Sequence, residues 1–329
     1  MNETEDFWSR QANVQSHSLA FAPLGTPAAI TANDPAVLAA ARLSAGRYSR
    51  ALNVGSRPIR ISIVVGAQAT PSVPPDLPDR LVYAGLGDWL TVSAGEWGHG
   101  FANRQTREAF VFLSPALAAE PSLVSRYFVD HYLLNLLMTE WAMLHASCVV
   151  DPAGRLTLMV APHNTGKSTT ALRLMRAGYT FLADGMALLK TDGPRLLVGG
   201  YPIGEVKLRD DVLALFPEYT GDAVQVREHR KTVVNLRAAH PAQLAESVFS
   251  PSAVRLLFVG QGAATAAEPL TDRAQVLAAI APNTVFWDEP TALEHNTATL
   301  NRLLDVARVH RFTLGPDPAQ IISAMEALE

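Results

Sequence analysis

Hydrophobic and polar positions divide the chain into two differently patterned parts that meet near residue 121. In the first part, short apolar stretches bounded by turn-forming residues predict strands at residues 60–65, 81–84, 89–93 and 109–113. Asn33-Asp34-Pro35 predicts a helix start with Asp34 as its cap, and the prolines of residues 68–79 predict an irregular loop. We therefore expect residues 1–121 to form a smaller, sheet-rich N-terminal domain with antiparallel strands.

The second part opens with apolar residues at helical spacing. They predict one amphipathic helix over residues 122–144, and they are Leu123, Tyr127, Leu134, Leu137, Met138 and Trp141. Such a helix either packs in the core or binds a partner, and the spacing favours the core. We expect it to connect the first domain to the second, so that the second domain spans residues 122–329.

After residue 144 the pattern alternates between strands and helices. Strands are predicted at residues 155–160, 179–183, 196–198, 205–208, 224–236, 254–259 and 312–314. Helices are predicted at residues 169–177, 273–280, 299–306 and 319–328. This alternation is typical of an α/β fold.

The segment APHNTGKS, residues 161–168, lies between a predicted strand and a predicted helix. It matches the phosphate-binding loop pattern G-x-x-x-x-G-K-[ST], except that Ala161 replaces the first glycine. Backbone N–H groups at such a loop bind phosphate oxygens, the lysine reaches the β- and γ-phosphates, and the serine hydroxyl holds Mg²⁺. The residues expected to bind the nucleotide are Ala161, Asn164, Thr165, Gly166, Lys167, Ser168 and Thr169. Because alanine tolerates positive φ poorly, Ala161 either has a negative φ or distorts the loop.

Two further polar residues accompany this loop. His145 precedes a predicted strand, and Asp184 follows the apolar run YTFLA, so we expect its carboxylate at the C-terminal end of a strand, near the loop. Asp184 is a candidate for accepting the proton of a hydroxyl or for helping Ser168 to hold Mg²⁺. A carboxylate that caps a turn and a histidine buried in the core are the structural alternatives.

Together, LHASCVV, APHNTGKS and RAGYTFLADG resemble the catalytic domain of the HPr kinase/phosphorylase family, which is related in fold to phosphoenolpyruvate carboxykinase. The resemblance is good over residues 144–189 and loose from there to the C-terminus, and the N-terminal region has no close counterpart in the family. It implies a P-loop core that uses ATP and Mg²⁺, with Asp184 as the base and His145 nearby. Two positions depart from the family: Ala161 replaces the first loop glycine, and Gly185 replaces the second aspartate. The signature for phosphorolysis is not recognisable, so we do not expect the reverse reaction.

Other charged residues and one rival motif have weaker claims. Glu205 and Lys207 are candidates for supporting the site, although solvated strand ends are favoured, while Arg230 and Lys231 fit a phosphate contact and a solvated basic face equally. The run TVFWDEPT, residues 284–291, resembles the Walker B motif of ABC-transporter ATPases. Because no matching signature sequence precedes it, we interpret it as a coincidence.

Composition excludes several classes of protein. The 329 residues are 48% hydrophobic with a net charge of −4, which argues against nucleic acid as the main partner. The single cysteine, Cys148, excludes an intrachain disulfide and is expected to be a buried thiol. The acidic N-terminus is unlike a signal peptide, and polar residues interrupt the most apolar run, so we expect a cytoplasmic protein with no membrane span.

The sequence thus favours an ATP-dependent kinase that transfers the γ-phosphate to a hydroxyl of a peptide, protein or small molecule. The alternatives are a catalytically weak, nucleotide-binding regulatory or accessory protein and, less favoured, an ABC-like ATPase. The sequence names neither the acceptor nor the purine, and it leaves the oligomeric state open, a homo-oligomer included.

Overall fold

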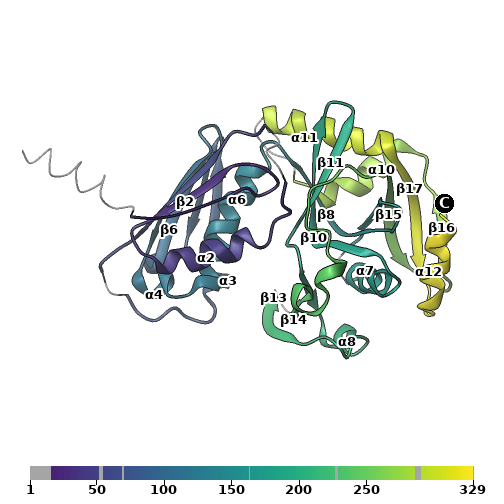
Figure 1. Ribbon diagram of the computed structural model, residues 1–329, viewed down its shortest axis with the longest axis horizontal. Helices are drawn as coiled ribbons and strands as arrows, with labels where there is room; N and C mark the ends of the chain where they lie inside the picture. The colour runs from purple at the N-terminus through teal and green to yellow at the C-terminus, as the bar shows by residue number, and fades with distance from the viewer. Residues whose placement is uncertain are drawn as a thin grey trace, which may run out of the picture. The chain divides into compact units, whose positions relative to one another are not determined.

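The computed structural model describes residues 16–51, 55–68, 70–162, 164–226, 229–285 and 290–328, and it divides into two compact units (Figure 1). Within these residues, the first unit contains residues 16–46, 51–140 and 290–292, and the second contains residues 47–50, 141–285 and 293–328. The boundary near residue 140 lies later than the expected one near residue 121, because the helical segment in between belongs to the first unit.

The first unit contains a seven-stranded sheet in the order β1-β2-β3-β7-β6-β5-β4. Its strands are β1 His17–Phe21, β2 Ala28–Ala32, β3 Ile59–Val65, β4 Val82–Leu86, β5 Trp89–Ser93, β6 Gly98–Asn103 and β7 Glu108–Leu113. The four predicted strands are present, whereas β1, β2 and β6 were missed. The sheet is mixed, because β3 runs parallel to both β2 and β7 while the other pairs are antiparallel. The prediction of an antiparallel sheet is therefore wrong for two of its strand pairs.

Short helices accompany this sheet. They are α2 Ala36–Ala45, α3 Leu77–Arg80, the 3₁₀ turn Gly95–Trp97, α4 Pro115–Ala118, α5 Pro121–Val124, the π-helical turn Ser125–Val129 and α6 Asp130–Leu137. The predicted start of α2 is close, since Asp34 Oδ1 accepts a hydrogen bond from the backbone N–H of Ala36. The irregular loop predicted at residues 68–79 is too long at its C-terminal end, because helix α3 begins at Leu77.

The helix predicted over residues 122–144 is only partly correct. Helical structure ends with α6 at Leu137, and strand β8 begins at Ala142. Trp141, which fitted the helical spacing, and Leu144, the last residue of the predicted helix, therefore lie outside the helix, and Leu144 is a buried strand residue. The apolar run is continuous across this point, so helical periodicity alone could not locate the change from helix to strand.

The second unit is built on another seven-stranded sheet, in the order β11-β10-β8-β9-β15-β17-β16. Its strands are β8 Ala142–Val150, β9 Arg155–Val160, β10 Thr180–Asp192, β11 Arg195–Tyr201, β15 Ala253–Gln261, β16 Ala266–Pro269 and β17 Ala307–Leu314. The three central strands β9, β15 and β17 are parallel, and the flanking pairs are antiparallel. The described residues therefore form a mixed α/β fold.

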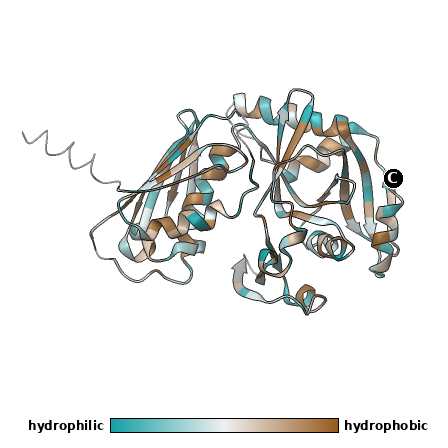
Figure 2. Ribbon diagram, in the orientation of Figure 1, coloured by the Kyte–Doolittle hydropathy of each residue, from teal (hydrophilic) through white to brown (hydrophobic). Residues whose placement is uncertain are grey.

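Helices cover both faces of this sheet. They are α7 Lys167–Arg176, α8 Asp210–Leu213, α9 Leu236–Ala239, the 3₁₀ turns Pro241–Gln243 and Ala281–Asn283, α10 Arg273–Ile280, α11 Pro290–Val306 and α12 Ala319–Glu326. Apolar residues of α7 and α12 form one buried cluster with the sheet, and residues of α10 and α11 form another on the opposite face. Figure 2 shows hydrophobic residues along the central strands that these helices cover.

A small three-stranded sheet packs on the α7 side of the second unit. It contains β12 Glu205–Leu208, β13 Gly221–Val226 and β14 His229–Asn235, in the order β12-β14-β13. The single strand predicted at residues 224–236 is therefore two antiparallel strands. Val206 and Val234 from this sheet join the α7 cluster. No helix in the described part of the chain is long and apolar enough to cross a membrane.

Candidate functional site

The segment that connects β9 to α7 has the strand–loop–helix arrangement that the sequence predicts. Strand β9 is central and largely buried, with β8 on one side and β15 on the other. The chain leaves its C-terminal end at Val160, passes through residues 161–166 and enters α7 at Lys167. His163 lies outside the described residues. The first backbone N–H groups of a helix have no partner within that helix, so the N-terminus of α7 can bind an anion.

Two residues of the loop have positive φ angles. Asn164 has a φ of 63°, which asparagine tolerates better than most residues, and Gly166 has a φ of 107° as the residue preceding α7. A Cβ atom on Gly166 would lie 2.9 Å from Leu314 Cδ1, at the C-terminal end of β17. Glycine is therefore required at position 166 both for its backbone conformation and for space.

Ala161 does not distort the loop. Among the described residues other than glycine, Leu24, Arg107 and Asn164 have a positive φ. The φ angle of Ala161 is therefore negative, which is the first of the two possibilities that the sequence left open. Its side chain is buried in the same apolar cluster as α7. The loss of the first loop glycine is accommodated because this backbone conformation does not need one.

Lys167 is folded back over the loop. Its Nζ donates hydrogen bonds to the carbonyl oxygens of Ala161 and Pro162, at 2.7 Å and 3.1 Å, and the side chain is only 8% exposed. Burial lowers the pKa of Lys167, Asp184 opposes this shift, and Lys231 adds to it. In this position the ammonium group of Lys167 is held by backbone oxygens of the loop, beside the start of α7.

Asp184 accepts hydrogen bonds from two serines. The Ser168 hydroxyl lies 2.9 Å from Oδ1 and 2.8 Å from Oδ2, and the hydroxyl of Ser147 donates to Oδ1. Ser168 is in the first turn of α7, and Ser147 is the residue opposite Asp184 on β8. The structure thus brings the candidate carboxylate to the loop, together with a second serine, Ser147, that the sequence motifs do not include. A polar residue two positions after His145 in an apolar strand was the available signal for Ser147.

The position of Asp184 within its strand differs from the prediction. β10 continues to Asp192, so Asp184 lies in the interior of a long strand and not at its C-terminal end. A β-bulge between Phe181 and Ala183 determines which way its side chain points. Phe181 packs in the α7 cluster, while Leu182 and Ala183 both pack in the cluster on the other face. The extra residue therefore returns Asp184 to the α7 face.

His145 lies on the same face as Asp184 and Ser147. It is half-buried, pairs across the strands with Met186, and is two positions before Ser147 on β8. Residues two apart on a strand share one face. Cys148, the next residue after Ser147, points into the opposite cluster and is fully buried, and burial raises its pKa. The predicted buried thiol is confirmed.

Gly185 leaves little space for a second carboxylate. A Cβ atom at this position would lie 3.3 Å from Pro202 Cδ and 3.3 Å from the carbonyl oxygen of Tyr201. These distances are short for a Cβ contact, so a larger residue would require Tyr201 or Pro202 to shift. The close packing of Tyr201 and Pro202 therefore fits a glycine at this position.

The remaining charged candidates divide into two groups. Glu205 forms an ion pair with Arg47, at 2.9 Å between Arg47 Nε and Oε1, which gives it a structural role. Lys207 and Lys231 are half-buried on β12 and β14, and Arg230 is exposed. The rival motif TVFWDEPT lies partly outside the described residues, since residues 286–289, with its Asp288 and Glu289, are among those not described. Helix α11 begins directly after them, at Pro290.

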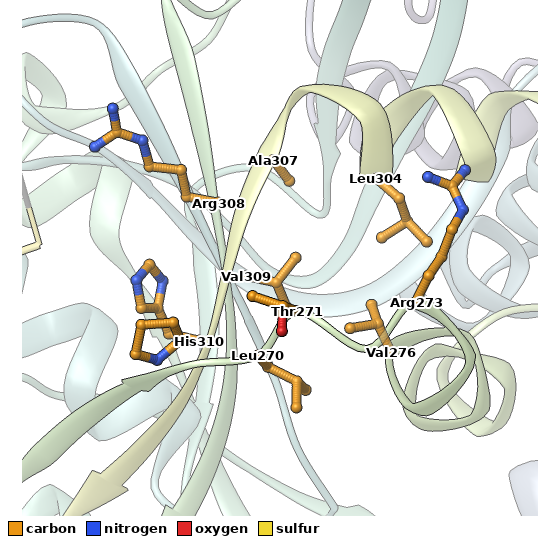
Figure 3. Close-up of a pocket in the computed structure, with 10 residues that line it drawn as sticks. Leu270, Thr271, Arg273, Val276, Leu304, Ala307, Arg308, Val309 and His310 are labelled. Atoms are coloured by element: carbon orange, nitrogen blue, oxygen red, sulfur yellow. The ribbon is translucent and has the colours of Figure 1, made fainter.

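A cavity of about 440 Å³ lies apart from the loop (Figure 3). Leu270, Val276, Leu304 and Val309 give it apolar walls, and Arg273 lies at its side. Arg273 is already paired with Asp305 and Asn301. The cavity borders the N-terminal half of β17, whereas Leu314 at the other end contacts the loop region, so the cavity is not part of the candidate site.

The donor set at the loop fits a magnesium ion. Mg²⁺ prefers oxygen ligands, and it commonly takes one or two from the protein and the rest from phosphates and water. The Ser168 hydroxyl and the Asp184 carboxylate are two such oxygen donors within hydrogen-bond distance of each other. They are the residues that would hold the ion.

Comparisons with known proteins give one similar solved structure and no matching family model. No protein-family model matches the sequence, and no curated protein matches it. Among solved structures, one similar chain is the HPr(Ser) kinase/phosphatase from Coxiella burnetii, with 12% identity over 56% of this chain and 95% of that chain. The TM-score of this match is 0.29. Function therefore has to be inferred from the loop, Ser168 and Asp184 themselves.

Proposed function

We propose that this protein is an ATP-dependent phosphotransferase that passes the γ-phosphate to a hydroxyl group of a peptide, protein or small molecule. The observation that carries the proposal is the hydrogen bond between Ser168, at the start of α7, and Asp184 on β10. It joins a phosphate-binding loop to a carboxylate on a separate strand. Phosphoryl transfer depends mainly on such positioning and on neutralising charge.

Each residue has a distinct role in the proposed reaction. The N-terminus of α7 and Lys167 bind the phosphates, after Lys167 exchanges the carbonyl oxygens of Ala161 and Pro162 for phosphate oxygens. Asp184 accepts the proton of the acceptor hydroxyl while the oxygen of that hydroxyl forms a bond to the γ-phosphorus. The bond between the γ-phosphorus and the bridging oxygen of the β-phosphate breaks, and ADP is released. Mg²⁺, when bound, neutralises charge on the phosphates.

A second function has a specific observation in its favour. Gly185, with Pro202 and Tyr201 closely packed beside it, leaves the site with one carboxylate where the resembling family has two. A site that lacks the second carboxylate would bind nucleotide with little turnover. A nucleotide-binding regulatory or accessory protein is therefore the alternative.

Two measurements test the proposal. Lys167→Ala removes a charge-assisted phosphate contact worth about 1.5–3 kcal/mol, so we expect ATP affinity measured by calorimetry to fall at least about tenfold. Lys190→Ala removes a lysine that lies over the ring of Trp141, away from the loop, and should keep wild-type affinity. Unchanged affinity for Lys167→Ala would contradict the nucleotide site.

The second measurement is transfer of labelled γ-phosphate from ATP to a panel of hydroxyl acceptors, comprising serine and threonine peptides, sugars and small alcohols. Transfer that requires an acceptor supports the kinase. Tight ATP binding without transfer to any acceptor, and with negligible hydrolysis, would favour the regulatory alternative.

A further inference from the structure

Ser147 is a buried polar residue with no place in the function described so far. It lies on β8, its side chain is fully buried, and its cross-strand partner is Asp184. Along the same face of β8, the residue two positions later is the apolar Val149, and the residue paired with Ser147 on β9 is the apolar Met159. A buried hydroxyl in such surroundings is costly unless it has a hydrogen-bond partner.

The partner of the Ser147 hydroxyl is one particular oxygen of the carboxylate. Ser147 donates to Oδ1 of Asp184, and no other acceptor for this hydroxyl is seen among the described residues. Because Ser147 has no exposed surface, a nucleotide or an acceptor cannot reach it. Any effect of Ser147 on chemistry at the loop must therefore pass through Asp184.

Ser168 provides a different kind of contact to the same carboxylate. Its hydroxyl lies in the first turn of α7, and under the proposed function the same oxygen would hold Mg²⁺. This hydroxyl would then have another partner, whereas the contact from Ser147 is inside the sheet and would persist. Ser147 is thus the serine whose contact with Asp184 would not change when nucleotide and metal bind.

We propose that Ser147 is a positioning residue, which fixes Oδ1 of Asp184 so that Oδ2 faces the loop and the acceptor. This inference rests on the proposed function, since it assigns Asp184 a role at the loaded site. A carboxylate with one oxygen held by a buried donor has a defined direction for the other oxygen. Partners of this kind, one step removed from the reacting groups or the metal, typically change metal affinity or activity by about 10- to 100-fold when they are removed.

The test compares Ser147→Ala with Thr157→Val in the full-length protein. Thr157 is also fully buried, on the neighbouring strand β9, and its hydroxyl has no hydrogen-bond partner among the described residues, so it controls for the loss of a buried hydroxyl. The measurements are kcat and KM for phosphoryl transfer, the Kd for ATP, and the affinity of the ATP complex for Mn²⁺ by electron paramagnetic resonance. Mn²⁺ replaces Mg²⁺ as the observable ion.

For Ser147→Ala we expect kcat and Mn²⁺ affinity to fall about 10- to 100-fold, with the Kd for ATP within twofold of wild type. Thr157→Val should leave all of these values unchanged. In an Asp184→Asn background, Ser147→Ala should cause no further loss, because the residue through which it acts is already disabled. If Ser147→Ala does not fold, Ser147→Cys keeps the size with a weaker donor and should give an intermediate loss.

The outcomes separate this inference from the proposed function. Wild-type transfer together with unchanged kcat and Mn²⁺ affinity in Ser147→Ala would overturn the role of Ser147 and leave the kinase intact. A fully additive loss in the Asp184→Asn background would also overturn it. Absence of transfer in the wild type, with a tenfold fall in Mn²⁺ affinity for Ser147→Ala, would reject the kinase and retain the positioning role.

Discussion

The Ser168 hydroxyl lies 2.9 Å from Oδ1 and 2.8 Å from Oδ2 of Asp184, so one side chain from helix α7 meets both oxygens of a carboxylate on strand β10. In this arrangement Ser168 donates its proton to the group with which it would share a metal ion. Binding of nucleotide and Mg²⁺ would therefore exchange a hydrogen bond for two metal–oxygen contacts. The residues that hold this part of the site together are therefore the same two that would hold the ion.

The first prediction concerns Asp184. Asp184→Asn keeps the size of the side chain but cannot accept the acceptor's proton, so we expect kcat to fall by roughly 10²–10⁴ while the Kd for ATP changes only a few-fold. Asp192→Asn is the matched control, since Asp192 is exposed on the same strand and pairs with Arg195. Steady-state transfer and ATP titration measure both effects. If the wild type transfers phosphate rapidly and Asp184→Asn is equally active, the base is another residue, and His145 is the next one to test.

The second prediction concerns Ala161. Because Ala161 does not have a positive φ, a glycine at this position has no strain to relieve. Ala161→Gly should leave the Kd for ATP within twofold of wild type and destabilise the protein by roughly 0.4–1 kcal/mol, through greater freedom of the unfolded chain. Calorimetric titration and thermal unfolding measure the two quantities. A clear gain in affinity would show that the alanine does distort the loop when nucleotide binds.

The third prediction compares two glycines that flank α7. Gly166 and Gly178 have φ angles of 107° and 95°, but only Gly166 has a neighbour in the way of a Cβ atom. Substitution by alanine should destabilise the protein by about 1–3 kcal/mol at either site, from backbone strain. Gly166→Ala should in addition weaken ATP binding, because the loop must move away from Leu314. Gly178→Ala should leave ATP binding unchanged.

Leu314→Ala provides the control for this interpretation. In a Gly166→Ala background it removes the side chain that the new methyl group would meet at 2.9 Å. We expect it to restore part of the lost ATP affinity and none of the strain from the positive φ. If Leu314→Ala restores no affinity, the effect of Gly166→Ala comes from the backbone alone.

The fourth prediction concerns pH and the first unit. Burial lowers the pKa of His131 to about 4, from 6.5. The unfolded chain therefore binds a proton at a higher pH than the folded chain, and the free energy of unfolding should fall as the pH decreases from about 6.5 to 4. His131→Phe keeps an aromatic ring against Tyr83, whose ring lies 4.7 Å from that of His131, and removes the titration. The variant should lose less stability over this range, by up to about 3 kcal/mol.

Urea denaturation at several pH values, followed by tryptophan fluorescence, measures this difference. The comparison is between the slopes of stability against pH, so a constant loss of stability from the substitution does not affect it. Parallel slopes for the wild type and His131→Phe would show that His131 is not responsible for acid sensitivity.

The sequence predicted the local part of the candidate site well. The strand, loop and start of helix around Lys167 and Ser168 depend on residues close in the chain, and apolar periodicity with glycine and lysine at fixed spacing is enough to place them. The direction of Asp184 could not be predicted in this way. It depends on a bulge at Leu182, and strict alternation from Phe181 would have put Asp184 on the other face.

Long-range pairing accounts for the other differences. Ser147 acquires its partner through the register of β8 with β10, which no local pattern specifies. The helix predicted over residues 122–144 changes to a strand because residues from Ala142 onward pair with β10, and this tertiary pairing overrides helical spacing. Similarly, residues 224–236 form one continuous apolar and basic stretch in the sequence, which predicts a single strand. In the structure they belong to two strands, β13 and β14, that pair with each other as a hairpin.

The contact between Gly166 and Leu314 has a consequence for the order of events during synthesis. The loop emerges from the ribosome together with β9 and α7, but β15 and β17 are made much later, and β15 must insert between β9 and β17 as a parallel strand. Pairings between distant segments form slowly because the intervening chain has to be ordered first. A nascent chain halted before β17 would therefore carry the whole segment APHNTGKS without Leu314, the residue beside Gly166, so this loop would reach its final surroundings only after β17 is made.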